Sequence, residues 1–288
     1  MSVIDRFALR AQWFDNCMKI VNLESWESFE KEVSKFFDAV QKIKTEKHPF
    51  IVSTPIFRGH ANASWKLQTT LERFTERTFG VEDYYWTMQS VRPAVVSITE
   101  KNWDLPESIV GAIPPTGYAF MVYLRHHGFP SPLLDWTRSP FVAAFFAFRS
   151  REKQTDDRVA IYSYVEWRGD AKHFQGQAPR VHGLGPYVVS HKRHYAQQCE
   201  YTICRKKVDE NYEYSSHEAA FLDNKSDQGA LTKYTLPVSE RTKALKQLYR
   251  MNVTTFSLFG SEESLMDTLA YKEIEDLWSK ERDEANPA

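Results

Sequence analysis

The chain has 288 residues, of which 42% are hydrophobic and 26% are charged, and its formal net charge is −1. This composition is typical of a globular protein with a substantial core, and the near-zero charge excludes attraction to nucleic acid by bulk charge. The 11 glycines are few for this length, and neither a G-x-G-x-x-G nor a G-x-x-x-x-G-K-[ST] motif occurs. A glycine-rich dinucleotide fold and a P-loop are therefore not expected.

The N-terminus and the cysteines indicate the compartment. Residues 1–7 show no basic segment followed by an apolar one, so no secretory signal peptide is expected. No run approaches the ~20 apolar residues that a membrane-spanning helix needs. The 3 cysteines fit a reducing compartment better than a disulfide framework. We therefore expect a cytoplasmic protein with no membrane partner.

The first predicted element is an amphipathic helix over residues 25–45, which His48-Pro49 ends. A short strand over residues 51–57 follows it and runs directly into Arg58-Gly59. Residues 65–73 then pass through a turn into a second helix. The apolar residues of the first helix fall at three- and four-residue steps: Trp26, Phe29, Val33, Phe36, Phe37 and Val40.

Arg58 and Gly59 form the first candidate site. A guanidinium at a strand end can hold a phosphate or carboxylate through two parallel hydrogen bonds. Gly59 has no side chain, which would let the backbone approach a ligand. The alternative is structural: Arg58 would pair with a core acid, for which Asp135 is the obvious candidate.

The middle of the chain is predicted to be helical on either side of an irregular segment. Residues 84–99 read as a helix interrupted by Pro93, and residues 102–117 as irregular structure or a lid. A helix over residues 120–127 is closed by Gly128. Ser139 can cap a buried, almost wholly apolar helix over residues 141–148, with Pro140 at its first position.

Asp135 precedes this last helix in an apolar neighbourhood, between Leu134 and Trp136. A buried carboxylate must be paired or hydrogen-bonded. The strand-to-helix corner formed by Asp135, Trp136 and Thr137 could face an anionic ligand, because helix N-termini favour anions. The alternative, which the local pattern favours, is a capping motif in which Asp135 accepts from the amides of Thr137 or Ser139.

His126 and His127 lie just before the same corner. Neighbouring residues do not share a helix face, so at most one of the two imidazoles can point into a pocket. We assign His127 to the binding site and place the other at the helix end, where a cation is favoured.

In the C-terminal half, residues 159–165 and 201–204 are predicted strands, 239–248 a helix, 253–256 a strand and 262–269 a last amphipathic helix. Interleaved elements of this kind predict an α+β fold, with a mixed sheet core and flanking helices. No repeat or low-complexity linker appears. We expect an extension over residues 1–24, a single domain over 25–276 and a polar tail over 277–288.

Residues 190–207 are the most basic stretch. Interleaved basic and aromatic residues suit contact with nucleic acid, although an edge strand protected by lysine and arginine is the commoner explanation. On a strand, Gln198 and Glu200 would face the same side. Cys199 and Cys204, with two histidines upstream, have only weak zinc-site character, and buried structural thiols are the preferred interpretation, so no metal is predicted.

The motif Phe57-Arg58-Gly59 resembles the FRG-domain family, which is named after it. Further matches are Trp65-Lys66-Leu67 and Arg73, the run from His126 to Pro130, the run from Leu133 to Thr137, Pro140, and the helix from Ala143 to Ala147. Two departures are Arg125 in place of the family's Gln and Ser131-Pro132 in place of its Thr-Arg. The resemblance spans roughly residues 25–275.

A more distant resemblance concerns ADP-ribosyltransferases of the Arg–Ser–Glu type. These enzymes place an Arg on a first strand, a Ser/Thr motif on a middle strand and a Gln/Glu-x-Glu on a later one. The chain offers Arg58, then the segment 135–137, then Gln198-Cys199-Glu200 in that order. The resemblance implies an ADP-ribosyltransferase-like fold.

The second resemblance also implies roles. Arg58 and its neighbours Gly59, Asp135 and His127 would bind NAD, with the guanidinium on the pyrophosphate. Glu200 would bond the ribose hydroxyl and stabilise the oxocarbenium-like charge as nicotinamide leaves. The remaining roles are Thr137 on the nicotinamide ribose, Gln198 on the acceptor, and Tyr201 or Trp136 stacking on nicotinamide.

The resulting hypothesis is a transferase that moves ADP-ribose from NAD to RNA, DNA or protein, acting as an intracellular toxin or anti-phage defence effector. Such an activity would imply a neutralising antitoxin protein as a partner. Two alternatives remain open at this point: a non-catalytic module that binds a nucleotide or nucleic acid, and an NAD glycohydrolase with water as the acceptor.

Overall fold

A computed structural model describes residues 18–46, 52–106, 113–150, 155–166, 178–185, 192–222 and 229–276. Its centre is one mixed sheet with the strand order β1-β8-β4-β2-β3-β6-β5, to which β7 adds by pairing with β6. The pair β1–β8 is parallel and the other pairs are antiparallel. The α+β prediction is confirmed. The strands are β1 (Lys19–Asn22), β2 (Ile56–His60), β3 (Leu134–Thr137), β4 (Arg158–Val165), β5 (Arg180–Gly183), β6 (Cys199–Val208), β7 (Asn211–Tyr214) and β8 (Ala230–Pro237).

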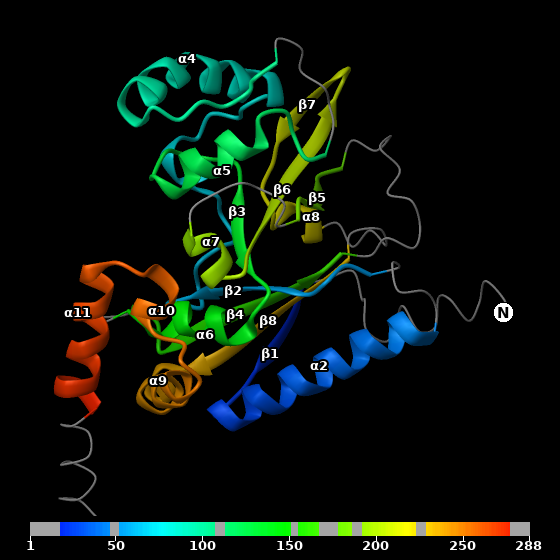
Figure 1. The fold of residues 1–288 in the computed structure, drawn as a ribbon. Coiled ribbons are helices and arrows are strands. Elements are labelled where there is room, and N and C mark those ends of the chain that lie inside the picture. Colours follow the sequence, from blue (N-terminus) through cyan, green and yellow to red (C-terminus); the bar gives the residue numbers. More distant parts are fainter. Residues whose placement is uncertain are drawn as a thin grey trace, which may run out of the picture.

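The helices flank this sheet at both ends (Figure 1). In the described part of the chain they are α2 (Trp26–Glu46), α3 (Thr70–Phe74), α4 (Val81–Thr99), α5 (Tyr118–His126), α6 (Pro140–Phe148), α7 (Lys192–Ala196), α8 (Ala219–Leu222), α9 (Arg241–Arg250), α10 (Thr255–Phe259) and α11 (Glu262–Ala270). A 3₁₀ turn η1 (Val238–Glu240) and a π-helical turn η2 (Tyr271–Asp276) complete them. No helix in the described ranges is long and apolar enough to cross a membrane.

Most predicted elements are present, and two predictions are wrong. Helix α4 runs through Pro93 without a break, although an interior proline costs a helix one backbone hydrogen bond. Residues 253–256 are no strand: Thr254 caps α10 by accepting from the Ser257 amide. The strand β1 lies within the predicted N-terminal extension and pairs with β8 from Lys19↔Thr232 onward.

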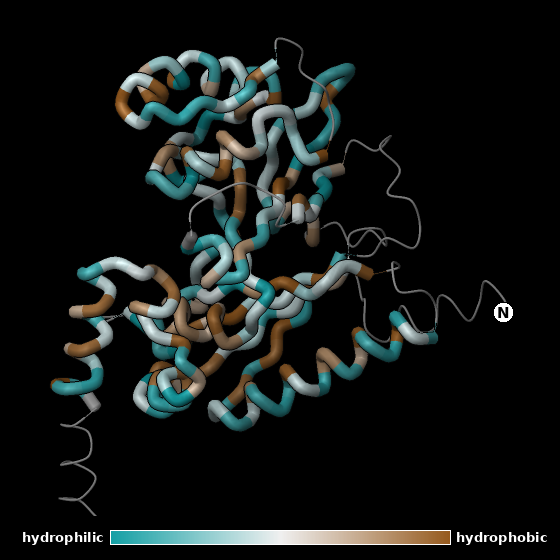
Figure 2. Tube along the Cα trace, viewed as in Figure 1, coloured by the Kyte–Doolittle hydropathy of each residue, from teal (hydrophilic) through white to brown (hydrophobic). Residues whose placement is uncertain are grey.

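The elements form two halves that share the sheet. One core gathers around α6, with side chains from α2, β2 and α9, and a second core joins α4 and α5 to β6. In Figure 1 the first half lies below and the second above, and β3 and β6 run between them. Helix α2 alternates hydrophobic and hydrophilic residues, as expected for a helix with one face on the sheet, whereas α6 is apolar throughout (Figure 2).

Helix α6 packs unusually close to β2. Its N-terminus is capped as predicted, with the Ser139 side chain accepting from the Val142 amide and Pro140 at the first position. At Gly59, a Cβ atom would lie 1.9 Å from the Ala143 carbonyl oxygen and 2.7 Å from the Ala147 nitrogen. The space beside Gly59 is therefore filled by the helix backbone. Helix packing, and not the expected approach of a ligand, requires this glycine.

Candidate functional site

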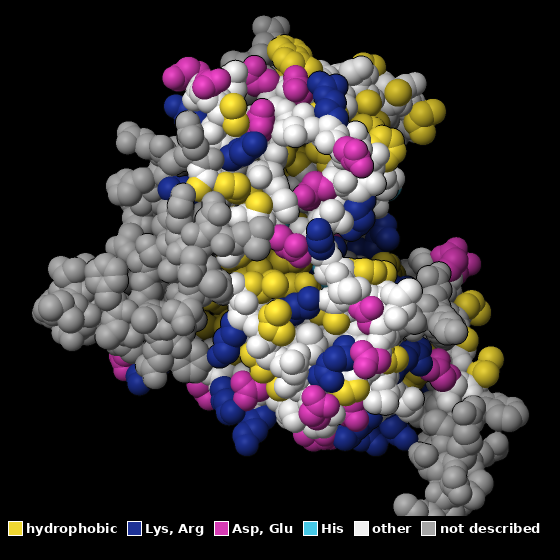
Figure 3. All heavy atoms as spheres, turned by 180° about the vertical axis from the view of Figure 1, so that it is seen from behind, with side chains coloured by type: hydrophobic (Ala, Val, Ile, Leu, Met, Phe, Trp, Pro, Cys, Tyr) yellow, Lys and Arg dark blue, Asp and Glu magenta, His cyan; other side chains and the backbone are white. Residues whose placement is uncertain are grey.

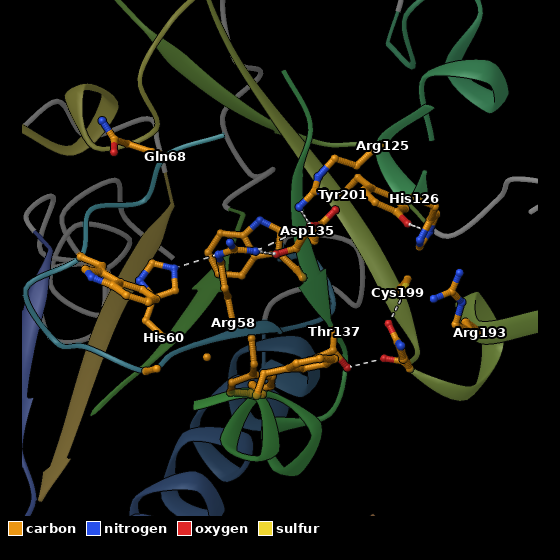
Figure 4. A pocket seen from close by; sticks show the side chains of 18 of the residues that line it. Arg58, His60, Gln68, Arg125, His126, Asp135, Thr137, Arg193, Cys199 and Tyr201 are labelled. Carbon is orange, nitrogen blue, oxygen red and sulfur yellow. Dashed lines mark hydrogen bonds and ion pairs between the residues drawn. The ribbon is translucent and has the colours of Figure 1, made fainter. Parts of the chain in front are cut away.

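A cavity of about 710 Å³ opens where β2, β3 and β6 meet (Figure 4). The pairing of β2 with β3 is confined to Phe57↔Thr137, so beyond this point the two strands separate. Residues of β2, α3, α5, β3, α6, α7, β6 and α10, and of the loop after β2, surround the opening. The lining residues are Phe57, Arg58, Gly59, His60, Ala61, Trp65, Lys66, Gln68, Arg73, Arg125, His126, Asp135, Trp136, Thr137, Ala143, Phe146, Arg193, Gln197, Cys199, Tyr201 and Phe259.

Arg58 bridges the separation between β2 and β3. Its Nε donates to Nε2 of His60 at 3.0 Å, and its Nη1 donates to the Asp135 carbonyl oxygen at 2.8 Å and lies 4.0 Å from Oδ2 of the same residue. Within the described residues, Nη2 has no hydrogen-bond partner. The guanidinium is thus held on two sides, and one edge is left toward the cavity. The contact with Asp135 that we expected is present, and the free edge is available to an anionic ligand.

Burial and neighbouring cations both act on Arg58. The pKa of Arg58 is lowered to about 10, and burial is the largest cause. The Asp135 carboxylate raises this pKa, and the positive charges of Arg125 and Arg73 lower it. The guanidinium stays protonated at neutral pH. An anion in the cavity would relieve the repulsion among the three arginines.

His60 is a hydrogen-bond acceptor for this arginine. It is 6% exposed, and burial, followed by the charge of Arg58, lowers its pKa to about 3. The imidazole is therefore neutral at physiological pH, which leaves Nε2 free of a proton to accept from Arg58. Sequence reasoning missed this role, although His60 follows Gly59 directly in the same strand.

Under the hypothesis of an NAD-binding cavity, we predict that His60→Leu weakens the binding of ADP about 10-fold, because the guanidinium of Arg58 loses one of its two anchors. His60→Gln keeps an acceptor at the end of the side chain and should stay within about twofold of the wild type, on the same principle of retained hydrogen bonding. Isothermal titration calorimetry with ADP, together with the melting temperature of each variant, checks this. Equal losses in both variants would show that only the imidazole ring matters there.

Asp135 is held by arginine rather than by backbone amides. Its Oδ2 accepts from Nη2 of Arg125, and within the described residues Oδ1 has no hydrogen-bond partner. The expected capping role is wrong. Thr137 takes it instead: its Oγ1 accepts from the Ser139 amide at 3.1 Å and donates to the Gln197 carbonyl oxygen at 2.7 Å. Thr137 thus lines the cavity with a hydroxyl that is already engaged.

The strand β6 turns Cys199 and Tyr201, and not Glu200, toward the cavity. Alternate residues of a strand face opposite sides, and Cys199 and Tyr201 are the lining residues of β6. Glu200 is 6% exposed and accepts from Nε of Arg138 at 2.6 Å. Gln198 lies before the strand, exposed, with a left-handed φ of 50°. The expectation that Gln198 and Glu200 project together into the site is therefore wrong, because β6 begins at Cys199.

Of the two adjacent histidines, His126 faces the cavity. His127, which we assigned to the site, is exposed and packs on Tyr123 with ring centroids 4.3 Å apart. His126 Nε2 and the Tyr201 hydroxyl are 2.7 Å apart. Burial lowers the pKa of His126 to about 4, opposed by Asp135, and burial raises the pKa of Tyr201. No local signal separated the two, because His126 and His127 each follow an apolar or aromatic residue, Val122 and Tyr123, by four positions.

The lining carries a strong excess of positive charge. Of the lining residues, Arg58, Lys66, Arg73, Arg125 and Arg193 are cationic and Asp135 is the one acid. The chain as a whole has a formal net charge of −1, so the cations are concentrated at this place. They come from residues 58 to 193, and no local pattern could have shown that they converge. Aromatic rings, among them Trp65, Trp136 and Phe259, share the lining.

In the part of the chain that the structure describes, the basic stretch and the two cysteines are built into β6 and its neighbours. Lys206 pairs with Glu213 at 3.3 Å and Arg205 lies over the Tyr212 ring at 4.7 Å, so β7 covers part of this charge. Cys199 and Cys204 lie five positions apart on β6, so they face opposite sides of the strand. Cys199 belongs to the core around α4 and α5, and Cys204 to a further cluster that contains Trp136 and Tyr164. The described ranges contain no group of three metal-ligating side chains, and His191 lies outside them.

Comparison with known families gives one result. Residues 53–156 match the sequence model of a family described as the FRG domain, so the resemblance to this family is confirmed for that segment. This segment contributes β2, β3, α6 and most of the charged lining of the cavity. No curated protein and no solved structure matches the chain. The resemblance to ADP-ribosyltransferases stays a prediction.

Proposed function

We propose that this chain, which carries an FRG domain at residues 53–156, binds NAD in the cavity and transfers its ADP-ribose to a macromolecule. The observation that carries the proposal is the set of five cationic side chains around one cavity, with Arg58 anchored so that its Nη2 has no partner among the described residues. A guanidinium fixed in this way is suited to a phosphate oxygen. The volume of about 710 Å³ lies within the range of small-molecule sites.

The proposed binding mode follows from the positions of the free atoms. The pyrophosphate would lie at Arg58 and Arg73, which both line the cavity and are near enough for the charge of Arg73 to lower the pKa of Arg58. Planar groups of the ligand would stack on lining rings such as Trp65. Oδ1 of Asp135 would accept a hydrogen bond from a ribose hydroxyl, since its other oxygen is held by Arg125.

The chemistry needs few protein groups. The bond between the nicotinamide nitrogen and C1′ of the ribose breaks, and nicotinamide leaves with the bonding electrons. A nucleophile of the acceptor forms the new bond to C1′ and loses its proton. Asp135 would stabilise the positive charge that develops on the ribose, which moves to Asp135 the role that we expected of Glu200. His126 is neutral and lines the same cavity, so it would take the proton.

A second candidate, a module that binds nucleotides without catalysis, is favoured by one observation. Among the described lining residues Asp135 is the only carboxylate, and Arg125 already neutralises part of its charge. Under this alternative the cavity would bind ADP and NAD and release no nicotinamide. The proposed roles as toxin or defence effector, and the neutralising partner, depend on the transferase activity.

The test compares two carboxylate-to-amide variants. Wild type, Asp135→Asn and Glu200→Gln are each incubated with NAD labelled in the adenylate moiety and with a cell extract containing RNA, DNA and protein. We expect labelling of one acceptor class, a loss of ~100-fold in Asp135→Asn and at least half the activity in Glu200→Gln. The latter weakens the ion pair with the partly exposed Arg138 and changes no residue that lines the cavity.

The other outcomes are equally specific. Free nicotinamide without labelled macromolecule would identify a glycohydrolase, and binding of NAD without turnover would identify the non-catalytic module. Loss of labelling in Glu200→Gln alone would return the catalytic role to Glu200 and contradict the assignment to Asp135.

A further inference from the structure

Trp65 presents a half-exposed indole ring at the cavity. It is one of the lining residues, and 51% of its surface is exposed. Its ring meets that of His60 with centroids 6.2 Å apart and an interplanar angle of 60°, so the two rings are not stacked face to face. The indole therefore offers uncovered aromatic surface to a planar group of a ligand.

The backbone that carries Trp65 is held from several sides. The Trp65 amide donates to the Asn62 carbonyl oxygen at 3.3 Å, and the Trp65 carbonyl oxygen accepts from the Tyr162 hydroxyl at 3.3 Å. The Leu67 amide donates to Oε1 of Glu218 at 2.9 Å. Since the backbone is already ordered, a ligand that stacks on this ring would lose little affinity to ordering of the loop.

The same segment carries a cation for the pyrophosphate. Arg73 lies on α3, and its Nη1 donates to the Gln68 carbonyl oxygen at 3.1 Å. Its charge lowers the pKa of Arg58, so it acts on the arginine that we propose for the phosphates. The segment from Trp65 to Arg73 thus supplies both an aromatic ring for a base and a guanidinium for the phosphate joined to that base.

Arg58 lies between this segment and the residues proposed for the chemistry. Figure 4 shows His60 on one side of Arg58 and His126 on the other. The hydrogen bonds of Arg58 have the same arrangement, with Nε on His60 and Nη1 on the Asp135 carbonyl oxygen. A pyrophosphate joins the two nucleosides of NAD. When bound at Arg58, it would extend one nucleoside toward Asp135 and the other toward Trp65.

We infer that the indole of Trp65 is the platform for the adenine of NAD, with the nicotinamide half of the ligand on the Asp135 side. This rests on the proposed function, which places the reacting ribose at Asp135, and it adds the direction in which the dinucleotide lies. A ligand that carries both adenosine and phosphates would use Trp65 and the arginines together. A nicotinamide nucleotide without adenosine would not reach Trp65.

Calorimetric titration tests this with three ligands: ADP, inorganic pyrophosphate and nicotinamide mononucleotide. The proteins are wild type, Trp65→Leu, Trp65→Phe and Trp86→Leu, and the melting temperature of each variant shows that it is folded. Trp86 is the matched control, because it is 57% exposed, lies on α4 and is not among the residues that line the cavity.

We expect Trp65→Leu to weaken the binding of ADP ~10-fold, the scale of one stacked base. The affinities for pyrophosphate and for nicotinamide mononucleotide should stay within about twofold of the wild type, since neither ligand would touch Trp65. Trp65→Phe keeps an aromatic ring and should lose less than about threefold for ADP. Trp86→Leu should bind all three ligands as the wild type does.

Unchanged ADP affinity in Trp65→Leu overturns the inference. An equal loss for ADP and for either of the other two ligands also overturns it, because adenine would then not be the group that Trp65 contacts. A loss confined to nicotinamide mononucleotide would reverse the direction of NAD in the cavity and contradict the assignment as well. Absence of ADP binding to the wild type would instead overturn the proposed function itself.

Discussion

Arg58→Gln is expected to weaken the binding of ADP by ~100-fold or more, the largest effect of any single substitution in the cavity. The guanidinium of Arg58 is fixed by His60 and by the Asp135 carbonyl oxygen, with Nη2 left for the ligand. Removing one partner of a desolvated charge interaction costs about 2–5 kcal/mol, and each 1.4 kcal/mol is tenfold in affinity. Calorimetric titration with ADP measures the loss.

The substitution should affect binding more than folding. Arg125 still pairs with Asp135 in the variant, so no carboxylate is left buried without a partner. Arg58→Lys serves as a second variant: it keeps the charge and cannot make both anchoring bonds while presenting a donor to the ligand. We expect it to bind at least tenfold more weakly than the wild type. Wild-type affinity in either variant would contradict the assignment of Arg58 to the phosphate.

Gly59→Ala is expected to destabilise the folded protein by about 3 kcal/mol or more, at or beyond the upper end of overpacking costs. The added methyl group would lie 1.9 Å from the Ala143 carbonyl oxygen and 2.7 Å from the Ala147 nitrogen. Both atoms belong to the α6 backbone, which cannot move as a side chain could. The helix is buried in the first core, so a shift of α6 would disturb the packing around it.

Chemical denaturation of the purified variant measures this effect. Gly80→Ala is the matched control, because there the nearest atom to an added Cβ is the Asp83 carboxylate oxygen at 3.4 Å, and we expect a change below about 1 kcal/mol. Should Gly59→Ala prove as stable as the wild type, α6 would have to lie farther from β2 than the structure shows.

Much of the local structure could be predicted from the sequence, because it depends on nearby residues. The capping serine and the proline after it placed the start of α6, and the apolar steps from Trp26 to Val40 gave α2. Gly128, with a left-handed φ of 85°, ends α5 as expected. Where predictions were wrong, as for residues 253–256, a short run of β-branched and aromatic residues favoured a strand, and the cap at Thr254 decided for a helix.

The site could be predicted only in part. The motif at residues 57–59 and the corner at 135–137 were identified from the sequence and lie together in the cavity. Which residues of β6 face the cavity, Glu200 or its neighbours Cys199 and Tyr201, depended on the pairing register of the strand. A shift of one position exchanges the two faces of a strand. The choice between His126 and His127 depended in the same way on the rotation of α5.

The sequence by itself determined the elements and the FRG motif, because caps, turns and apolar periodicity act over a few residues. Tertiary structure alone decided what those elements bring together. Strand order placed Arg58 beside Asp135, which lies 77 residues away in the chain, and it gathered five cations from residues 58 to 193 around one cavity. Such convergence depends on long-range packing, in which backbone contacts such as that between Gly59 and α6 fix the walls of the site. Figure 3 shows the face of the molecule opposite to that in Figure 1. Hydrophobic side chains are visible between the two halves, with Lys and Arg side chains nearby.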